Sequence, residues 1–284
     1  MELNEKQFNE LKKQGMVRIQ NFINEEELSK IKKIIFSYKA LKTHKDTHFA
    51  NDPRSLFIKL AKGDLKKFKE SLYFIKLSKK KKLNSVADKY FLNKSSLIAV
   101  DGYYTPISNK EVLDWHCDRS NGNREVFDWP SDKSNSNNKK LVSTIDPDVR
   151  SLKFFIYLTD VSSNNGCMSY IPLSNKIAYI LKRGILENKI EYKKFQFLKD
   201  FRKIISEKNN YNYIKENLEE KDILDKFLND TEFVEKGTDT TKFDYNMKAG
   251  DAIIFDENGM HKGSKTLGNE RMVLRYFFRP KMRN

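Results

Sequence analysis

The sequence has few of the features that mark exported or membrane-spanning proteins. It contains only two cysteines, Cys117 and Cys167, in 284 residues. No apolar run approaches the roughly 18 residues that a membrane helix needs. Residues 1–6 are charged and lack the apolar core of a signal peptide. Because two thiols without an export signal favour a reducing compartment, we expect a cytoplasmic protein with no membrane span.

The chain has neither the composition of a disordered protein nor the charge pattern of a nucleic-acid-binding one. Hydrophobic residues make up 38% and aromatic residues 12%, enough to form the core of one large domain or two small ones. The net charge is +15, but lysines are spread along the chain and interleaved with acids. The densest cluster, residues 76–82, is typical of the polar end of a helix. We therefore expect a lysine-rich surface, compatible with an anionic small-molecule substrate, and no nucleic-acid partner.

Local patterns predict a helical first third followed by a region of strands. Capping signals predict helices that begin after Asn4 and Asn24, and Gly15 follows the first of them. Helical periodicity also covers residues 56–77 and 86–91. Short apolar segments bounded by turn residues predict strands. The expected strands are residues 16–19, 96–104, 112–117, 152–158, 167–171, 243–247, 252–255 and 271–278.

Two longer segments interrupt the expected strands. Residues 176–242 return to a helical period and predict a helical insertion. The residues that carry this period include Tyr192, Phe195, Leu198, Phe201 and Ile204. Residues 119–148 are polar and longer than an ordinary connection, which is typical of a functional lid or a disordered segment.

Together these elements predict a mainly β fold with helices, of the α+β class. The expected architecture is a jelly roll with helices packed on its outside. We expect a single domain over residues 1–284. Its parts are a mostly helical N-terminal region (1–94), jelly-roll strands (95–175 and 243–280) and the helical insertion (176–242).

Histidine is also scarce, which limits the candidates for a metal site. The four histidines are His44, His48, His116 and His261. Side chains alternate in a strand, so His116 and Asp118 project together while Cys117 turns to the opposite side as a core thiol. Such pairs are common on surfaces, but this one ends an apolar strand and precedes the long polar segment. The first two histidines lie in a polar stretch and are interpreted as surface residues, so His261 is the candidate third ligand.

Two imidazoles and one carboxylate on a single face predict a particular metal chemistry. They leave three positions of an iron ion open, and non-haem iron oxygenases use these positions for a bidentate 2-oxo acid and dioxygen. A zinc hydrolase is an alternative, although zinc favours a closed tetrahedron or a single open position. Halogenases of this chemistry lack the carboxylate so that halide can bind. The presence of Asp118 therefore favours hydroxylation or a related oxidation.

The last expected strand offers a cation for the far carboxylate of the 2-oxo acid. Arg271 and Arg275 share one face of that strand, and a guanidinium binds a carboxylate in bidentate fashion. Arg271 is preferred because it lies closer to His261 in the sequence. Arg119 and Trp129 follow the candidate ligands and are candidate substrate-pocket residues.

Four motifs occur in order along the β region. They are Trp-His-Cys-Asp at 115–118, Asn-Gly-Cys-Met-Ser-Tyr-Ile-Pro-Leu-Ser-Asn-Lys at 165–176, Ala-Gly-Asp-Ala-Ile-Ile-Phe at 249–255 and His-Lys-Gly-Ser at 261–264, followed by Arg271. With these motifs the sequence resembles the phytanoyl-CoA dioxygenase family, which includes ectoine hydroxylase. The resemblance covers about residues 95–280. Pro-Leu-Ser-Asn at 172–175 stands where the family typically has Pro-Gly-Ser-His.

The resemblance implies a double-stranded β-helix that binds Fe(II) through His116, Asp118 and His261. The residues that it implies for holding 2-oxoglutarate are Arg271, Tyr103, Lys153 and Ser264. The activity that it implies is hydroxylation of a small molecule with dioxygen, releasing succinate and CO2. Substrate choice is expected to lie in residues 119–148 and 176–242, which are this chain's own.

The substrate itself is left open by the sequence, since a fold does not specify it. Acyl-CoA, amino acids, sugars, phosphonates and peptidyl carriers are all compatible with the residues. The alternative function is a non-catalytic metal-binding jelly-roll protein whose basic surface holds an anionic partner.

Overall fold

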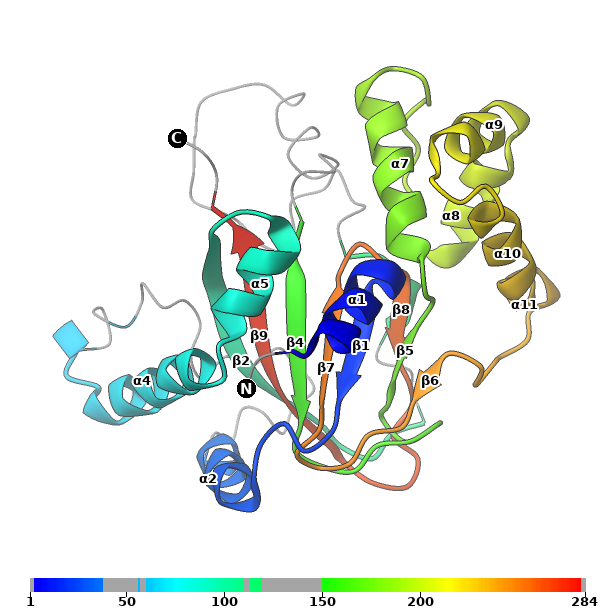
Figure 1. The fold of residues 1–284 in the computed structure, drawn as a ribbon. Coiled ribbons are helices and arrows are strands. Elements are labelled where there is room, and N and C mark those ends of the chain that lie inside the picture. The colour runs from blue at the N-terminus through cyan, green and yellow to red at the C-terminus, as the bar shows by residue number, and fades with distance from the viewer. Residues whose placement is uncertain (1–2, 38–55, 57–59, 110–112, 119–149, 282–284) are drawn as a thin grey trace.

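The computed structural model describes residues 3–37, 56, 60–109, 113–118 and 150–281. Two antiparallel sheets form the centre of the molecule, with helices around them (Figure 1). The five-stranded sheet has the order β1-β7-β4-β9-β2, and the four-stranded sheet has the order β3-β8-β5-β6. The strands are β1 (Met16–Ile19), β2 (Ser95–Thr105), β3 (Leu113–His116), β4 (Leu152–Tyr157), β5 (Met168–Tyr170), β6 (Asp244–Tyr245), β7 (Ala252–Asp256), β8 (His261–Gly263) and β9 (Arg271–Pro280). The predicted jelly-roll fold of the α+β class is confirmed.

The first helix, α1 (Glu5–Gln14), begins and ends where its capping residues predict. The Asn4 side chain accepts a hydrogen bond from the Gln7 amide at 2.8 Å, and the Gln7 side chain accepts one from the Asn4 amide at 3.1 Å. Gly15 ends the helix with a φ of 80°. A Cβ at this position would lie 2.4 Å from the Tyr170 hydroxyl, so the close approach requires glycine as well.

The other N-terminal helices are α2 (Glu25–Phe36), α4 (Leu65–Lys80) and α5 (Leu83–Phe91). Asn24 and Glu27 form the predicted capping box of α2. Glu27 also pairs with Lys80 and Lys81, both at 2.7 Å, and so ties α2 to the end of α4. These helices pack apolar side chains against the outer face of the five-stranded sheet. The cluster includes Phe8, Leu11, Ile31, Phe74, Phe154, Ile156 and Leu274.

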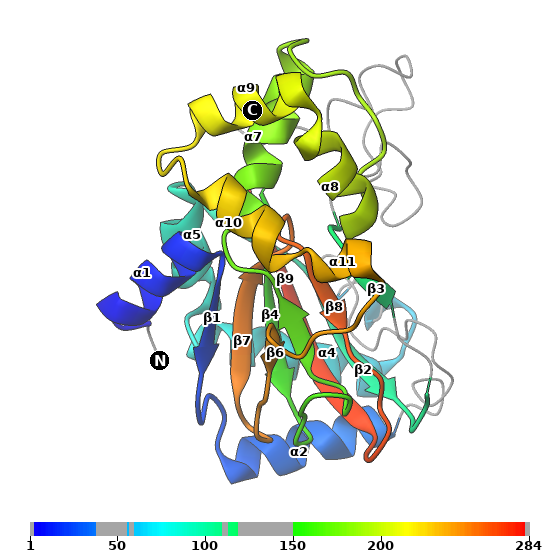
Figure 2. The ribbon, with the colours of Figure 1, turned by 90° about the vertical axis from the view of Figure 1, so that its right-hand side faces the viewer.

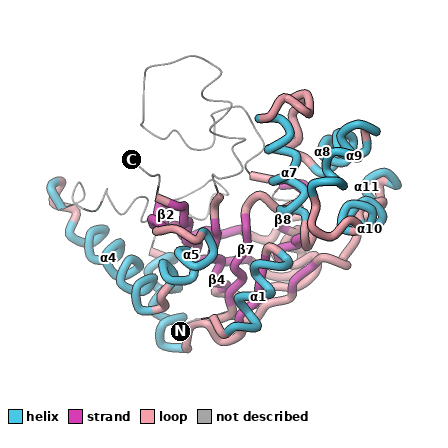
Figure 3. The backbone as a smooth tube through the Cα atoms, turned by 45° about the horizontal axis from the view of Figure 1, so that its top comes forward, coloured by secondary structure: helices cyan, strands magenta, loops and turns pink. Residues whose placement is uncertain are grey.

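The helical insertion follows β5 and precedes β6 in the chain. It consists of α7 (Ser174–Leu186), α8 (Leu198–Ser206), α9 (Lys208–Asn217), α10 (Ile223–Asp230) and α11 (Phe233–Lys236). Its helices gather at one end of the sheets, while α2 lies at the other end (Figure 2). They bury an apolar cluster of their own, which includes Ile177, Leu181, Phe201, Ile205 and Leu224. Figure 3 shows the strands β2, β4 and β7 between this group and the helices α4 and α5.

One expected helical stretch is not a helix. We call residues 187–197 the connector, because they link α7 to α8 without helical structure. The period through Tyr192 and Phe195 predicts a helix there, and this prediction is wrong. The Cys117 amide donates a hydrogen bond to the Gln196 carbonyl at 2.8 Å, and Phe197 pairs with His116 as in an antiparallel sheet. This pairing with the end of β3 holds the last residues of the connector extended, although Phe195 still packs into the insertion's apolar cluster.

The space between the two sheets is filled by a third cluster. It includes Tyr157, Phe255 and Val273 from the larger sheet and Met168 and Tyr170 from the smaller one.

Among the described residues, none of the helices has the length and apolar character to cross a membrane.

Candidate metal centre

Three side chains from two distant parts of the chain meet at the end of the sheets nearest the insertion. His116 ends β3 and His261 begins β8, and the two residues lie directly opposite each other in the antiparallel pair. Their ring centroids are 4.4 Å apart. Asp118, in the turn after β3, places its carboxylate oxygens 3.5 Å from His116 Nε2 and 3.2 Å from His261 Nε2. All three ligand atoms lie within 4.8 Å of one another, so one ion could contact them all.

Hydrogen bonds to the backbone fix which nitrogen of each histidine faces this point. His116 Nδ1 lies 2.7 Å from the Asp114 carbonyl, and His261 Nδ1 lies 2.8 Å from the Gly259 carbonyl. Because a carbonyl can only accept, each Nδ1 carries the proton and each Nε2 keeps its lone pair. The two Nε2 atoms are the ones that face Asp118, which is the arrangement that a metal ligand requires.

The local electrostatics favour the protonation states of ligands. Burial lowers the pKa of His261, and the neighbouring His116 lowers it further, so His261 is favoured as a neutral imidazole. Burial alone would raise the pKa of Asp118, but the Lys153 ammonium holds that pKa well below its usual value. The centre therefore combines two imidazole nitrogens with one anionic oxygen. This donor set fits a ferrous ion with three open positions.

Lys153 lies directly against this centre. Its ammonium pairs with Asp118 Oδ2 and lies 3.3 Å from Glu257 Oε2. Burial would lower the pKa of Lys153, but the Asp118 and Glu257 carboxylates outweigh it and raise that pKa. The ammonium also lies 5.2 Å above the Phe277 ring. The structure thus places Lys153 beside a candidate metal ligand, at the same end of the sheet.

The two arginines of β9 have different surroundings. Arg275 forms a two-pronged ion pair with Asp101, with N···O distances of 2.6 and 2.7 Å. Arg271 is 6% exposed, and its Nη1 donates to the Gly166 carbonyl at 3.3 Å. Its Nε has no hydrogen-bond partner in the part of the chain that the structure describes. A buried guanidinium with an unused donor is ready to bind an anion.

Thr105 and Tyr157 share the inner face of the larger sheet with Arg271. Thr105 lies directly opposite Arg271 in the β2–β9 pair, and Tyr157 lies opposite Val273 in the β4–β9 pair. Within the described residues, neither hydroxyl has a well-formed hydrogen bond, although both side chains are buried. The sequence reasoning missed both residues. The signal was available, because Tyr157 is four residues after Lys153 and so shares its face of β4.

The remaining predicted residues are placed as follows. Tyr103 presents its ring to Arg271, with the guanidinium carbon 5.3 Å from the ring centroid. The Ser264 hydroxyl is buried and lies 3.5 Å from Cys167 Sγ. Burial raises the pKa of Cys167 to about 11, so that thiol is neutral. Cys117 is buried and directs its thiol to the Asn258 carbonyl at 3.1 Å. The residues that lie outside the described part of the chain are His44, His48, Arg119 and Trp129.

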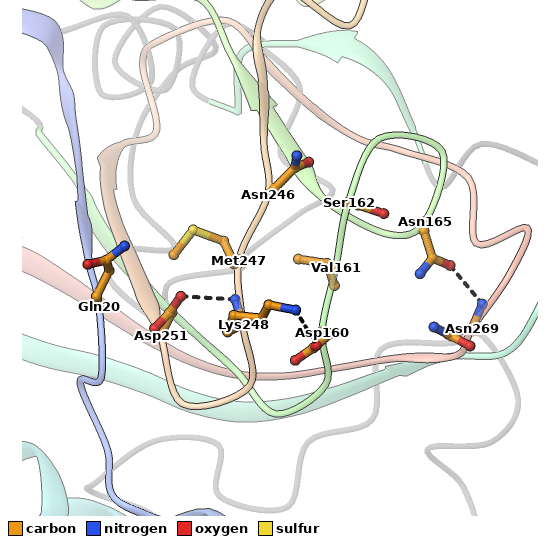
Figure 4. Close-up of a pocket in the computed structure, with 10 residues that line it drawn as sticks. All are labelled: Gln20, Asp160, Val161, Ser162, Asn165, Asn246, Met247, Lys248, Asp251 and Asn269. Carbon is orange, nitrogen blue, oxygen red and sulfur yellow. Dashed lines mark hydrogen bonds and ion pairs between the residues drawn. The ribbon is translucent and has the colours of Figure 1, made fainter.

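A separate pocket of about 410 Å³ is lined by residues of the segments that follow β4 and precede β7 (Figure 4). Several of its polar side chains bind one another or the backbone. Lys248 pairs with Asp160 at 2.9 Å, and Asp251 accepts a hydrogen bond from the Lys248 amide at 2.9 Å. Asn165 accepts one from the Asn269 amide at 2.7 Å. These bonds join loops around this pocket, away from the metal centre.

A jelly roll that gathers two imidazoles and a carboxylate at one end defines the class of non-haem iron oxygenases. The family model described as phytanoyl-CoA dioxygenase (PhyH) matches residues 11–273, and the chain belongs to this family. Non-haem iron and 2-oxoglutarate are therefore its cofactor and cosubstrate, and the His116, Asp118 and His261 cluster suits them. Among curated protein sequences, none is a significant match to this one.

Several solved structures share the fold. HygX from Streptomyces hygroscopicus, solved with nickel and 2-oxoglutarate, is 14% identical with a TM-score of 0.55, over 99% of this chain and 88% of HygX. The epimerase SnoN, solved with Fe3+, α-ketoglutarate and nogalamycin RO, is 9% identical with a TM-score of 0.53, over 97% of this chain and 83% of SnoN. The carbocyclase SnoK from nogalamycin biosynthesis is 13% identical with a TM-score of 0.50, over 98% and 84% of the two chains.

Proposed function

We propose that this protein oxidises a C–H bond of a small-molecule substrate by hydroxylation, with His116, Asp118 and His261 as its iron ligands. The observation that carries the proposal is the convergence of these three donors within 4.8 Å. The backbone carbonyls that hold each Nδ1 support it, because they leave each Nε2 free for the metal. Iron, once bound with 2-oxoglutarate and dioxygen, supplies the oxidant while the cosubstrate is converted to succinate and CO2.

The role that we propose for Arg271 is to bind the far carboxylate of 2-oxoglutarate. Burial lowers the pKa of Arg271, but a guanidinium stays charged in proteins. Its unused Nε and the hydroxyls of Thr105 and Tyr157 would supply donors from three neighbouring strands. The ion pair with Asp101 already engages Arg275, which favours Arg271 for this role. Tyr103, Lys153 and Ser264 remain proposed contributors to the cosubstrate site.

Hydroxylation is the outcome that the donor set favours. Asp118 fills the position that halogenases of this chemistry leave open for halide. SnoN and SnoK are described as an epimerase and a carbocyclase, so related folds serve other oxidations. The alternative function, a non-catalytic metal-binding protein with an anionic partner, is supported only by the net charge of +15.

The test is oxygen-dependent succinate formation by the iron-loaded protein across a panel of metabolite classes. We expect one class to stimulate succinate release and to gain one oxygen atom, measured by mass spectrometry. The control is His116→Ala, which should form no succinate above background. A protein that binds iron and 2-oxoglutarate yet never consumes oxygen with any class would favour the non-catalytic alternative. A product that gains chlorine or is epimerised would replace hydroxylation by that reaction.

A further inference from the structure

The turn between β7 and β8 is buried throughout, although turns usually run over the surface. Asp256 and Asn258 have no exposed surface, Glu257 is 4% exposed, and Met260 is fully covered. We call residues 256–260 the ligand turn, because His261 follows it directly. A buried turn must satisfy all of its polar groups within the protein, so its partners determine its position.

Some of these partners lie within the turn and in the N-terminal helices. Asp256 Oδ1 accepts hydrogen bonds from the backbone and side-chain nitrogens of Asn258, both at 2.9 Å. The Tyr90 hydroxyl of α5 donates to Asp256 Oδ2 at 2.6 Å. These bonds fix Asp256, but they leave the side-chain oxygen of Asn258 and the amide of Met260 for other partners.

Helix α7 of the insertion supplies those other partners. Lys182 has no exposed surface, and its ammonium donates to Asn258 Oδ1. The Tyr179 hydroxyl donates to Asp256 Oδ2 and accepts from Asn258 Nδ2 at 3.2 Å. Ser174 Oγ accepts from the Met260 amide at 2.8 Å. Three side chains on one helix therefore bind the turn along its length.

The ligand turn also contacts two residues of the metal centre, His261 and Asp118, and the neighbour of the third, Cys117. The Gly259 carbonyl orients His261 through Nδ1 at 2.8 Å. The Glu257 carbonyl accepts from the Asp118 amide at 3.2 Å, and the Asn258 carbonyl accepts from Cys117, next to His116, at 3.1 Å. A Cβ on Gly259 would lie 2.0 Å from the Tyr170 hydroxyl, so this part of the turn cannot move toward the sheet. A shift of Asn258 would therefore change the geometry of the centre.

We propose that Lys182 and Tyr179 are positioning residues for the metal centre. They act through Asn258 and Asp256 of the ligand turn and set the direction of the His261 ring. The first helix of the insertion is thus part of the metal scaffold as well as part of the region expected to select substrate. Groups that orient a metal ligand from outside typically change metal affinity or activity about 10- to 100-fold when they are removed. The inference rests on the proposed metal ligands and not on the reaction that they support.

The experiment measures binding of Co(II), an air-stable probe for the iron site, to the purified full chain. Lys182→Met keeps most of the side-chain volume and removes the ammonium, and we expect the Co(II) dissociation constant to rise about tenfold. Tyr179→Phe removes a single oxygen, and we expect a rise of about fivefold, equivalent to one hydrogen bond. The matched control is Lys176→Met, a half-exposed lysine of the same helix, which should bind Co(II) as the parent does.

Two further readouts separate positioning from simple loss of stability. The visible spectrum of bound Co(II), which reports ligand geometry, should change in both variants, while thermal unfolding of the metal-free proteins is followed in parallel. If both variants bind Co(II) with the parent's affinity and spectrum, the proposal is overturned, even if their unfolding temperature falls. Should Lys182→Met fail to fold, Tyr179→Phe decides alone. A parent that does not bind Co(II) would instead refute the proposed metal centre.

Discussion

The two helical regions support the sheets in different ways. The N-terminal helices press apolar side chains such as Leu11 and Phe74 onto the outer face of the larger sheet. The insertion packs mostly on itself, but its apolar cluster also takes in Trp115, Cys117 and Met260, and directed polar contacts from α7 and the connector add to this. Apolar packing stabilises a fold without directing individual atoms, whereas hydrogen bonds fix positions. The N-terminal helices, apart from the bond of Tyr90 to Asp256, should therefore act mainly on stability, and the polar contacts of the insertion should act mainly on the metal centre.

The largest effect should follow from removing a ligand of the metal centre, which the insertion supports. His261→Ala deletes one of three proposed donors, so we expect metal binding and succinate formation to fall to background. The free energy of unfolding of the metal-free protein should change far less than the free energy of Co(II) binding. Calorimetry with Co(II) and a succinate assay measure both quantities. A variant that retains the parent's turnover would show that His261 is not a ligand.

The next largest effect should come from the N-terminal side and should leave the metal centre unchanged. Leu11 has no exposed surface, so Leu11→Ala should lower the unfolding free energy by about 3 kcal/mol, because it removes apolar contacts and leaves a cavity. Denaturant unfolding measures this loss. The folded fraction should bind Co(II) as the parent does. A weakened metal site in folded Leu11→Ala would contradict the division between the two regions.

A smaller and more specific effect is expected at the cosubstrate. Arg271→Met should raise the KM for 2-oxoglutarate about 30-fold, since it removes a charge-assisted bond to a buried carboxylate. Affinity for Co(II) should stay the same, which steady-state kinetics and calorimetry together can establish. The control is Arg183→Met, an exposed arginine on α7 that should leave KM unchanged. An unaltered KM in Arg271→Met would move the role to another cation.

The smallest effect concerns the cap of α1. Asn4→Ala removes the side-chain oxygen that accepts from the Gln7 amide, and it should lower the unfolding free energy by about 1 kcal/mol. Thermal unfolding detects a change of this size, while turnover should be unaffected. Asn4→Ser, which keeps an acceptor at the cap, should lie close to the parent. If Asn4→Ala is as stable as the parent, the Asn4 cap does not stabilise α1.

Local patterns were sufficient for much of the fold and the centre. Capping residues located α1 and α2, and the alternation of side chains indicated that His116 and Asp118 act together. The scarcity of histidine left His261 as the partner, and the structure brings all three side chains within reach of one ion. These features depend on residues a few positions apart or on the number of histidines, so a single sequence is sufficient to predict them.

Other features depend on contacts between distant residues, which local patterns do not encode. Tyr192, Phe195 and Leu198 have the spacing of a helix, but the connector is extended because Phe197 pairs with His116 far away in the chain. Lys182 has the sequence context of a surface lysine, but it is buried and donates to Asn258, which is far away in the chain. The position of Thr105 opposite Arg271 depends on the pairing of β2 with β9, which lie far apart in the chain.

The pairing of Phe197 with His116 has a consequence for how the protein behaves in concentrated solution. β3 is the outermost strand of its sheet, and an open strand edge is a template on which another chain can add and start aggregation. The connector covers part of that edge through the bond from Cys117 to Gln196. Detachment of the connector would expose this strand edge and one side of His116 together. Loss of activity and self-association should therefore begin at the same step.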